Sequence, residues 1–216
     1  MKIALIGASG FVGSHLLTEL IARNHEVTAI VRNVDKVTDK SNLLKVAGVD
    51  VFNVSALAKV LKGNELVISA YNAGWTNPNI YDDFLKGSAA IQEAVKQSGV
   101  TRYLVIGGAG SLEIDGKQLV DGADFPPQIK PGATAARDYL NTLKKERVLD
   151  WTFFSPAIEM HPGITTGRTG KYRLGKDNPV FDTQGKCVLS VEDLAVVIAD
   201  EAENHQFSRQ RFTAAY

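Results

Sequence analysis

The fold of this chain is decided by one short stretch, Lys2-Ile3-Ala4-Leu5-Ile6-Gly7-Ala8-Ser9-Gly10-Phe11-Val12-Gly13. A brief apolar run comes first, three glycines follow at intervals of three, and an amphipathic segment continues to Arg23. The apolar run predicts a buried strand, and the segment behind it predicts a helix over 11–23. The glycines therefore lie where a strand turns directly into a helix.

Each of the three glycines has a separate physical reason to be there. Gly7 permits the tight turn off the strand, and Gly10 has no side chain to keep a diphosphate from the backbone. Gly13 lets the helix pack closely on the strand. The free N–H groups at the helix start, together with the helix dipole, favour an anion. This arrangement predicts that the turn binds the diphosphate of a nicotinamide dinucleotide.

The rest of the chain alternates between short apolar runs and longer amphipathic segments. This alternation predicts an α/β fold of the Rossmann type, a doubly wound parallel sheet. We expect a single domain over 1–216, in which 157–190 and 204–216 form a small cap on the substrate side. The expected strands are 2–6, 26–31, 50–52, 65–70, 103–106, 151–154 and 211–214, and the expected helices are 11–23, 55–61, 79–97, 134–147 and 191–203.

Composition narrows the class of partner. The 216 residues include 24 basic and 24 acidic ones, so the basic excess of a nucleic-acid-binding protein is absent. The single cysteine, Cys187, excludes an intrachain disulfide. No apolar stretch is long enough to span a membrane, and the run before Gly7 is too short for a signal peptide. We expect a cytoplasmic monomer or homodimer that binds a small-molecule acceptor and no metal, nucleic acid or membrane.

The residues after the second expected strand bear on the choice of cofactor. An acidic residue there commonly binds the ribose hydroxyls of NAD, whereas an arginine accepts the 2′-phosphate of NADP. Here Arg32 follows the strand, and a guanidinium matches a phosphate well. The sequence therefore favours NADP(H) over NAD(H), although Asp35 leaves a ribose contact open.

Several further motifs carry a family resemblance over essentially the whole chain. The chain resembles a bacterial group of atypical short-chain dehydrogenases/reductases, the NADH–flavin reductase or NAD(P)H-binding oxidoreductase group, which is related to biliverdin/flavin reductase and to NmrA-like regulators. The motifs are Gly107-Gly108-Ala109-Gly110-Ser111-Leu112-Glu113, Asp124-Phe125-Pro126, Ser155-Pro156-Ala157, Gly170-Lys171-Tyr172-Arg173-Leu174-Gly175, Ser190-Val191-Glu192-Asp193 and Arg211-Phe212-Thr213.

The resemblance implies a cofactor lying across the carboxyl ends of the strands. The diphosphate would contact the turn, Arg32 the adenosine phosphate, and Asn53 the adenine, although Asp is expected at position 53. Ser69 and Ala70 would lie near the adenine ribose or the diphosphate. The nicotinamide pocket would be floored by 107–109 and flanked by Pro156. The implied cofactor-binding residues are Gly7, Ser9, Gly10, Phe11, Val12, Gly13, Arg32, Asn53, Ser69, Ala70, Gly107, Gly108, Ala109 and Pro156.

The carbonyl-reducing Tyr-x-x-x-Lys pair of common short-chain dehydrogenases is missing. Tyr139 lies on the expected helix, but Leu143 stands four residues later, where a shared helix face requires the lysine. Ser111 fits the serine position and is the candidate catalytic residue, with a turn cap as its alternative role. A flat conjugated acceptor such as a flavin or quinone needs little help from a protein acid, because the cofactor carries the chemistry.

The expected substrate pocket combines Ser111, Phe125 and Tyr172. The segment 112–131 is long for a loop and is interpreted as a wall or lid over the substrate. Tyr71, Trp75 and His161 are weaker candidates, because ordinary packing is the favoured role of the two aromatic residues and a surface loop position is favoured for His161.

Three functions remain open from the sequence. The first is an NAD(P)H-dependent reductase of a flavin-like or quinone-like acceptor. The second is a redox sensor, related to NmrA-like proteins, that binds NAD(P) with little or no turnover. A sugar-nucleotide epimerase or dehydratase is disfavoured, because such enzymes need the Tyr/Lys pair.

Overall fold

The computed structural model describes all residues 1–216 and confirms the α/β prediction. Eight strands form one sheet in the order β3-β2-β1-β4-β5-β8-β10-β9, in which only β9 runs antiparallel to its neighbour. The strands are β1 (Lys2–Ile6), β2 (Glu26–Val31), β3 (Leu44–Gly48), β4 (Leu66–Ser69), β5 (Arg102–Ile106), β8 (Asp150–Ser155), β9 (Arg173–Gly175) and β10 (Gln210–Ala215).

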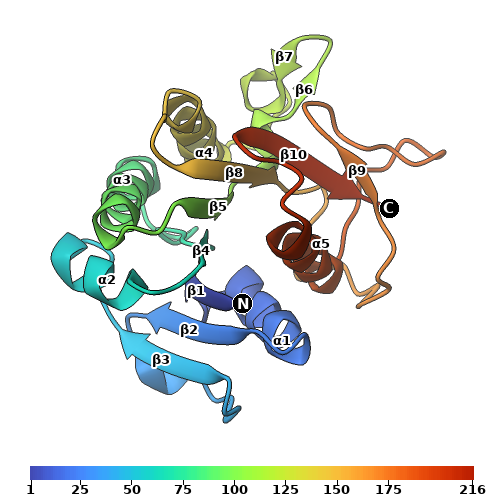
Figure 1. Cartoon of the computed structure of the whole chain (residues 1–216). Coiled ribbons are helices and arrows are strands. Elements are labelled where there is room, and N and C mark those ends of the chain that lie inside the picture. The colour runs from blue at the N-terminus through green and yellow to red at the C-terminus, as the bar shows by residue number, and fades with distance from the viewer.

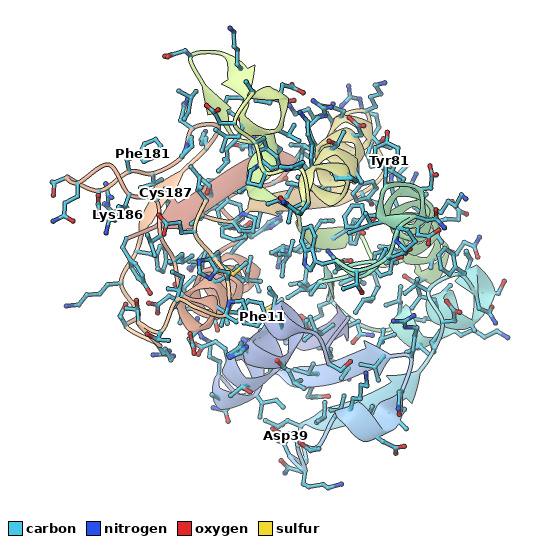
Figure 2. All side chains as sticks on the ribbon, turned by 180° about the vertical axis from the view of Figure 1, so that it is seen from behind. Phe11, Asp39, Tyr81, Phe181, Lys186 and Cys187 are labelled. Atoms are coloured by element: carbon cyan, nitrogen blue, oxygen red, sulfur yellow. The ribbon has the colours of Figure 1, made fainter.

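Helices cover both faces of this sheet (Figure 1). On one face α1 (Phe11–Ala22) packs beside α5 (Val191–Asn204), and on the other α3 (Ile80–Ser98) lies between α2 (Val54–Leu61) and α4 (Lys130–Leu143). The central strands β1, β4 and β5 are buried nearly throughout, as the continuous apolar runs predict. Figure 2 shows the side chains of these layers from behind, with Phe11 at the head of α1.

Strand order reverses between β1 and β4, since the chain passes from β1 outward to β2 and β3 before returning to β4. In an open parallel sheet such a reversal leaves a crevice at the carboxyl ends of the strands, where ligands bind. The glycine turn between β1 and α1 lies at this point, as does the loop after β4. The topology thus places the predicted binding turn at the sheet's natural ligand site.

One predicted strand is wrong. The third strand was expected at 50–52, but the chain forms β3 over Leu44–Gly48, and Asp50–Phe52 turns toward α2. The starts of α2 and α4 also differ from expectation, for local reasons. Asn53 caps α2 by accepting from the amide of Ala56, and α4 begins at Lys130 with Pro131 in its first turn.

The segments assigned to a cap and a lid contain regular structure. Within 112–131 a hairpin forms from β6 (Glu113–Ile114) and β7 (Lys117–Gln118), which projects beyond α4 and β10 in Figure 1. The end of 204–216 forms β10, which is inserted into the main sheet between β8 and β9 and is not part of a separate cap. No helix has both the length and the apolar character that a membrane crossing requires.

Candidate functional site

The glycine turn has the geometry that a bound diphosphate requires. Gly7 has φ +81°, a left-handed conformation that favours glycine, and a β-carbon there would come 2.7 Å from the carbonyl oxygen of Ala70. A β-carbon on Gly13 would come 2.1 Å from the carbonyl oxygen of Gly7, so only glycine lets α1 approach this closely. Gly10 ends the turn with φ −80° as the N-cap of α1.

The head of α1 is bare. Gly10 has no side chain to cap the helix, and the first turn holds no acidic residue. The first N–H groups of a helix have no partner within the helix, so those of Phe11, Val12 and Gly13 are available to donate to a group above the turn. The donor set and the missing side chain fit an anion such as a diphosphate.

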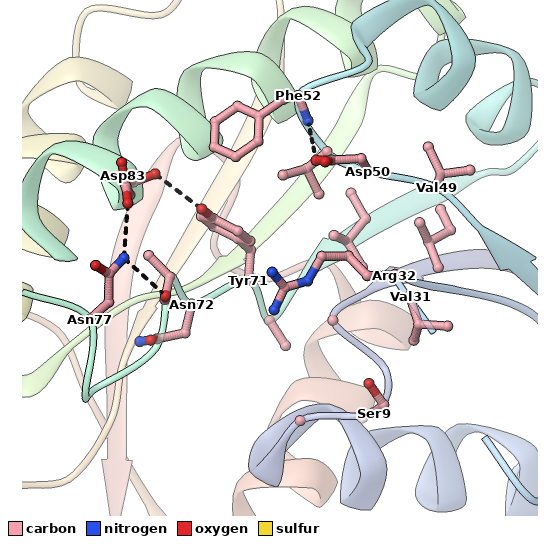
Figure 3. A pocket seen from close by; sticks show the side chains of 17 residues that line it. Ser9, Val31, Arg32, Val49, Asp50, Phe52, Tyr71, Asn72, Asn77 and Asp83 are labelled. Carbon is pink, nitrogen blue, oxygen red and sulfur yellow. Dashed lines mark hydrogen bonds between the residues drawn. The ribbon is translucent and has the colours of Figure 1, made fainter. Parts of the chain in front are cut away.

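A cavity of about 290 Å³ opens beside this turn, over the ends of β1, β2 and β4. Figure 3 shows its polar side chains, with Ser9 on the side of α1 and Arg32 reaching across toward Tyr71. Gly7, Gly10 and Ala70, which the sequence predicts to bind the cofactor, are among its lining residues. Its other main lining residues are Val31, Val49, Asp50, Val51, Phe52, Asn72, Ala73, Asn77 and Asp83.

Arg32 is the one cation among the residues that line this cavity. Its side chain is exposed and has neither a hydrogen bond nor an ion pair with any other side chain in the structure. Asp50, across the cavity, has its carboxylate oxygen engaged by the amide of Phe52 at 3.0 Å. A free guanidinium therefore stands at the end of β2, where a dinucleotide would place its adenosine ribose.

A second cavity, of about 510 Å³, lies over the ends of β5 and β8. Gly107, Gly108, Ala109, Pro156 and Phe125 all line it, so the residues predicted for the nicotinamide and substrate walls lie around one cavity. Gly107 must be glycine, because a β-carbon there would come 1.9 Å from the ring of Phe153. The turn after β5 consequently lies directly on the core and leaves the space above it open.

Tyr71 and Asn72 line both cavities, which therefore lie next to each other at the loop after β4. The Tyr71 hydroxyl donates to the backbone carbonyl of Asp83 at 3.0 Å, and burial together with the nearby charge of Asp83 raises the pKa of Tyr71. This phenol is therefore neutral and already engaged. Together the cavities extend from Arg32, past the glycine turn, to Gly108, along the line that a dinucleotide occupies in this fold.

Ser111 does not fit the predicted catalytic role. Its side chain is fully buried and does not line either cavity. Its hydroxyl donates to the carbonyl of Gly108 at 3.0 Å and lies 2.9 Å from the Ser155 hydroxyl. Arg211, itself buried, donates to the Ser111 carbonyl. Ser111 therefore stabilises the turn after β5 from beneath, which is the alternative role that the sequence left open.

The sequence prediction that places Tyr172 in the substrate pocket is also wrong. Its hydroxyl donates to Asp200 on α5, and the side chain packs against the core on the α1–α5 side. Burial, followed by the hydrogen bond to Asp200, raises the pKa of Tyr172 well above its ordinary value. It does not line the second cavity, so its role is structural.

Two of the expected adenine-side residues serve the fold instead. The Asn53 side chain caps α2, and its neighbours Asp50 and Phe52 line the cavity in its place. Ser69 is buried at the end of β4, where its hydroxyl accepts from the amide of Tyr71 at 3.4 Å. Both therefore shape the cleft without facing it.

Sequence reasoning undervalued the aromatic residues after β4. Trp75 and Tyr71 were interpreted mainly as packing residues, yet both line the second cavity. Their signal was their place in the loop after a central strand, at the sheet edge where ligands bind. His161, the third weak candidate, is exposed outside both cavities, and its Nδ1 lies 3.1 Å from the amide of Gly163.

Comparisons with known proteins agree with this geometry. The chain is 36% identical to the uncharacterized protein YwnB of Bacillus subtilis, over 99% of this chain and 97% of that protein. A crystal structure from Bacteroides thetaiotaomicron, of a candidate epimerase, has a TM-score of 0.91 and 47% identity over 100% of this chain and 96% of that one. A candidate NADH-flavin reductase from Streptococcus pneumoniae has a TM-score of 0.85 and 34% identity, with 100% and 99% coverage.

The family model described as NAD(P)H-binding matches residues 7–205, from the glycine turn to the residue after α5. The matched range contains Arg32, the turn after β5 and the two cavities that Tyr71 lines. The fold, the bare helix head and the two adjoining cavities have the same explanation: this chain belongs to the NAD(P)H-binding family and has an oxidoreductase-like Rossmann fold.

Proposed function

We propose that this protein is an NADPH-dependent reductase that passes hydride directly to a flat conjugated acceptor, such as a quinone or a flavin. One observation carries the proposal. The cavity beside the glycine turn adjoins, at Tyr71, an apolar cavity whose lining includes no lysine, histidine or cysteine. Such a cavity can align two rings but offers little acid–base chemistry.

The preference for NADPH over NADH rests on Arg32. Its guanidinium has no competing partner in the protein and faces the cavity at the end of β2 (Figure 3). Bidentate pairing with a phosphate is the interaction that a guanidinium makes best. Two acidic residues, Asp50 and Asp83, also line this cavity, and each has one carboxylate oxygen engaged, by the Phe52 amide and by the Asn77 side chain respectively.

Binding, alignment and exclusion of water are the tasks of this chain's own residues. The amides at the head of α1 hold the diphosphate, and Gly107 and Gly108 let the nicotinamide lie close to the backbone after β5. Phe125 and Pro156 flank that position and exclude water. The bound cofactor supplies the hydride in its reduced nicotinamide ring.

An epimerase or carbonyl reductase is a poorer match to the second cavity. On α4 the cavity is lined by Gly132, Ala133 and Ala136, which carry no acidic or basic group. Tyr139 lies on the same helix, but it is buried and hydrogen-bonds Gln92 and Tyr103. Burial is the main reason that the pKa of Tyr139 is raised, which keeps the phenol protonated and makes it a poor proton donor for such chemistry.

The experiment is a turnover assay that follows loss of nicotinamide absorbance with a naphthoquinone and with riboflavin as acceptors. We expect turnover with NADPH, a higher kcat/KM for NADPH than for NADH, and loss of that preference in Arg32→Gln. One charge-assisted contact amounts to about tenfold or more in affinity. Lys59→Gln, which removes an exposed charge from α2 outside the cleft, should leave the preference unchanged.

Two results would contradict the proposal in different ways. NADPH binding without turnover of any acceptor would leave a sensor that binds the dinucleotide. An unchanged NADPH preference in Arg32→Gln would remove the assignment of the 2′-phosphate site.

The proposal also places the protein in the cytoplasm, where NADPH is available. Cell fractionation tests this, since a structural relative from Burkholderia pseudomallei is described as exported.

A further inference from the structure

The charges of the acceptor cavity are unusual for a site that receives flavins. Among the residues that line it, only Asp124 carries a formal charge, and no lysine, arginine or histidine is among them. Apolar side chains make up most of the surface, including Phe84, Leu119, Phe125, Ile129, Ile158 and Met160. A phosphate placed in this cavity would meet apolar groups and one carboxylate.

The two arginines closest to this cavity on neighbouring elements are held by other partners. Arg137, on α4, is already bound by Asp138 at 2.6 Å and by Asp121 at 3.2 Å. Arg211, behind the turn after β5, is buried and bound to Asp177. The first turn of α4 offers little to an anion, because Pro131 has no N–H and the amide of Ala133 donates to Ile129.

Trp75 supplies the surface on which a planar ring can stack. It lies in the loop between β4 and α3, and its indole lies against α4 at Gly132, where a β-carbon would come 2.8 Å from the ring. The side chain is nevertheless 59% exposed, so one part of the indole remains free beside the cavity. Gly132 thus makes room for a tryptophan that the protein does not bury.

The loop that carries Trp75 is fixed at both ends to Asp83 on α3. The Tyr71 hydroxyl donates to the Asp83 carbonyl, and the Asn77 amide donates to the Asp83 carboxylate at 2.9 Å (Figure 3). Asn72 closes the loop by accepting from the amide of Gly74 at 2.7 Å. These bonds hold the loop that carries Trp75 in one position beside the cavity.

We infer that the acceptor subsite takes an uncharged planar ring, stacked on Trp75, and that Asp124 discriminates against the same ring when it carries a phosphate. The acceptor class is therefore a quinone, or an isoalloxazine without a phosphate tail. That the bound ring is then reduced rests on the proposed function. The ring's binding and its charge preference rest only on the cavity.

Riboflavin and its phosphate ester FMN form a matched pair of acceptors, because they differ only in the phosphate. We expect kcat/KM for riboflavin to exceed that for FMN at least fivefold at low salt, since like charges in a cavity repel. Asp124→Asn should narrow this ratio and Asp124→Lys should reverse it. Asp115→Asn, an equal change of charge on the hairpin between β6 and β7, should leave the ratio unchanged.

A binding assay separates this inference from the question of turnover. Of the two tryptophans, Trp151 is buried and Trp75 is exposed at the cavity. With NADP⁺ present, which cannot donate hydride, a neutral naphthoquinone should quench the Trp75 fluorescence saturably. Trp75→Phe should abolish this quenching, while a naphthoquinone that bears an anionic group should bind at least fivefold more weakly.

The outcomes are distinguishable. Quenching with the expected charge preference but no turnover supports the subsite and contradicts the reductase. Turnover in which FMN equals or exceeds riboflavin overturns the subsite and leaves the reductase standing. Absence of Trp75 quenching by the neutral ring also overturns the inference.

Discussion

The two glycines at the head of α1 should fail in opposite ways when each is replaced by alanine. In Gly13→Ala the new methyl group would lie 2.1 Å from the carbonyl oxygen of Gly7, nearly 1 Å closer than β-carbons come to such atoms. Both atoms belong to the backbone or are fixed to it, so no side-chain rotation relieves the contact. The helix must move away from β1.

The cost of that movement follows from what α1 buries. Leu16, Leu17 and Leu20 lie in the core cluster that α1 shares with β1, β2 and α5. Forcing one extra carbon into a well-packed contact costs about 1–3 kcal/mol. For a domain of this size that corresponds to a fall in Tm of about 2–12 °C.

Gly10→Ala should instead spare stability and reduce binding. Gly10 has φ −80°, which alanine adopts freely, and the nearest atom to its new methyl group would be the Gly7 carbonyl oxygen at 3.3 Å. The methyl group enters the cavity beside the turn, where the diphosphate must approach the amides. Loss of one charge-assisted hydrogen bond weakens NADPH binding by about tenfold or more.

Thermal unfolding and NADPH titration of the two variants, side by side, make the comparison, and each variant is the control for the other. Gly13→Ala should lower Tm, and Gly10→Ala should raise the Kd for NADPH with a Tm near that of the native protein. A Gly13→Ala protein of unchanged stability, or a Gly10→Ala protein of unchanged affinity, would refute the assigned roles.

Three further substitutions test the structural roles of individual side chains. Ser111→Ala should lower the free energy of unfolding by about 1–2 kcal/mol, because Ser155 loses a buried hydrogen-bond partner. Its kcat/KM should stay within twofold of the native value, and a large loss of turnover would restore Ser111 as a catalytic residue. Tyr172→Phe should likewise cost stability alone, through loss of the Asp200 hydrogen bond; a changed KM for the acceptor would contradict this. For Glu146, burial works to raise the pKa, but Lys96 and the amides of Val148 and Leu149 lower it from 4.5 to about 2. The stability that Glu146 contributes is therefore complete above about pH 5 and is lost as the pH falls from about 4.5 to 2. Denaturation of Glu146→Gln at several pH values should show a lower free energy of unfolding than the native protein at pH 7 and a smaller loss of it on acidification. Parallel pH curves for the two proteins would argue against this role.

The fold was accessible from the sequence because its strongest signals are local. A parallel strand buried on both faces is a continuous apolar run, and β1, β4 and β5 each have one. The edge strand β3 does not, because Lys45 and Val46 are exposed, and the more apolar stretch at 50–52 was predicted in its place. An edge strand is defined by a neighbour on one side only, which its own sequence does not record.

In the candidate site, too, the features with local causes were predictable and those that depend on distant contacts were not. Its backbone parts were predictable, because Gly7, Gly13 and Gly107 are each required by a close approach within one strand–turn unit or onto the core. Its side chains depend on which loops meet in space. Ser111 faces inward because Arg211, one hundred residues later, fixes the turn that carries it. Nothing near Ser111 in the sequence could indicate that contact.

A crystal structure of the protein with NADPH tests the central claim most directly. We expect the diphosphate at the amides of Phe11–Gly13, the 2′-phosphate on Arg32, and the nicotinamide over Gly107 and Gly108 with one face open to Trp75. A dinucleotide bound elsewhere, or a cleft that stays empty at saturating NADPH, would contradict the account.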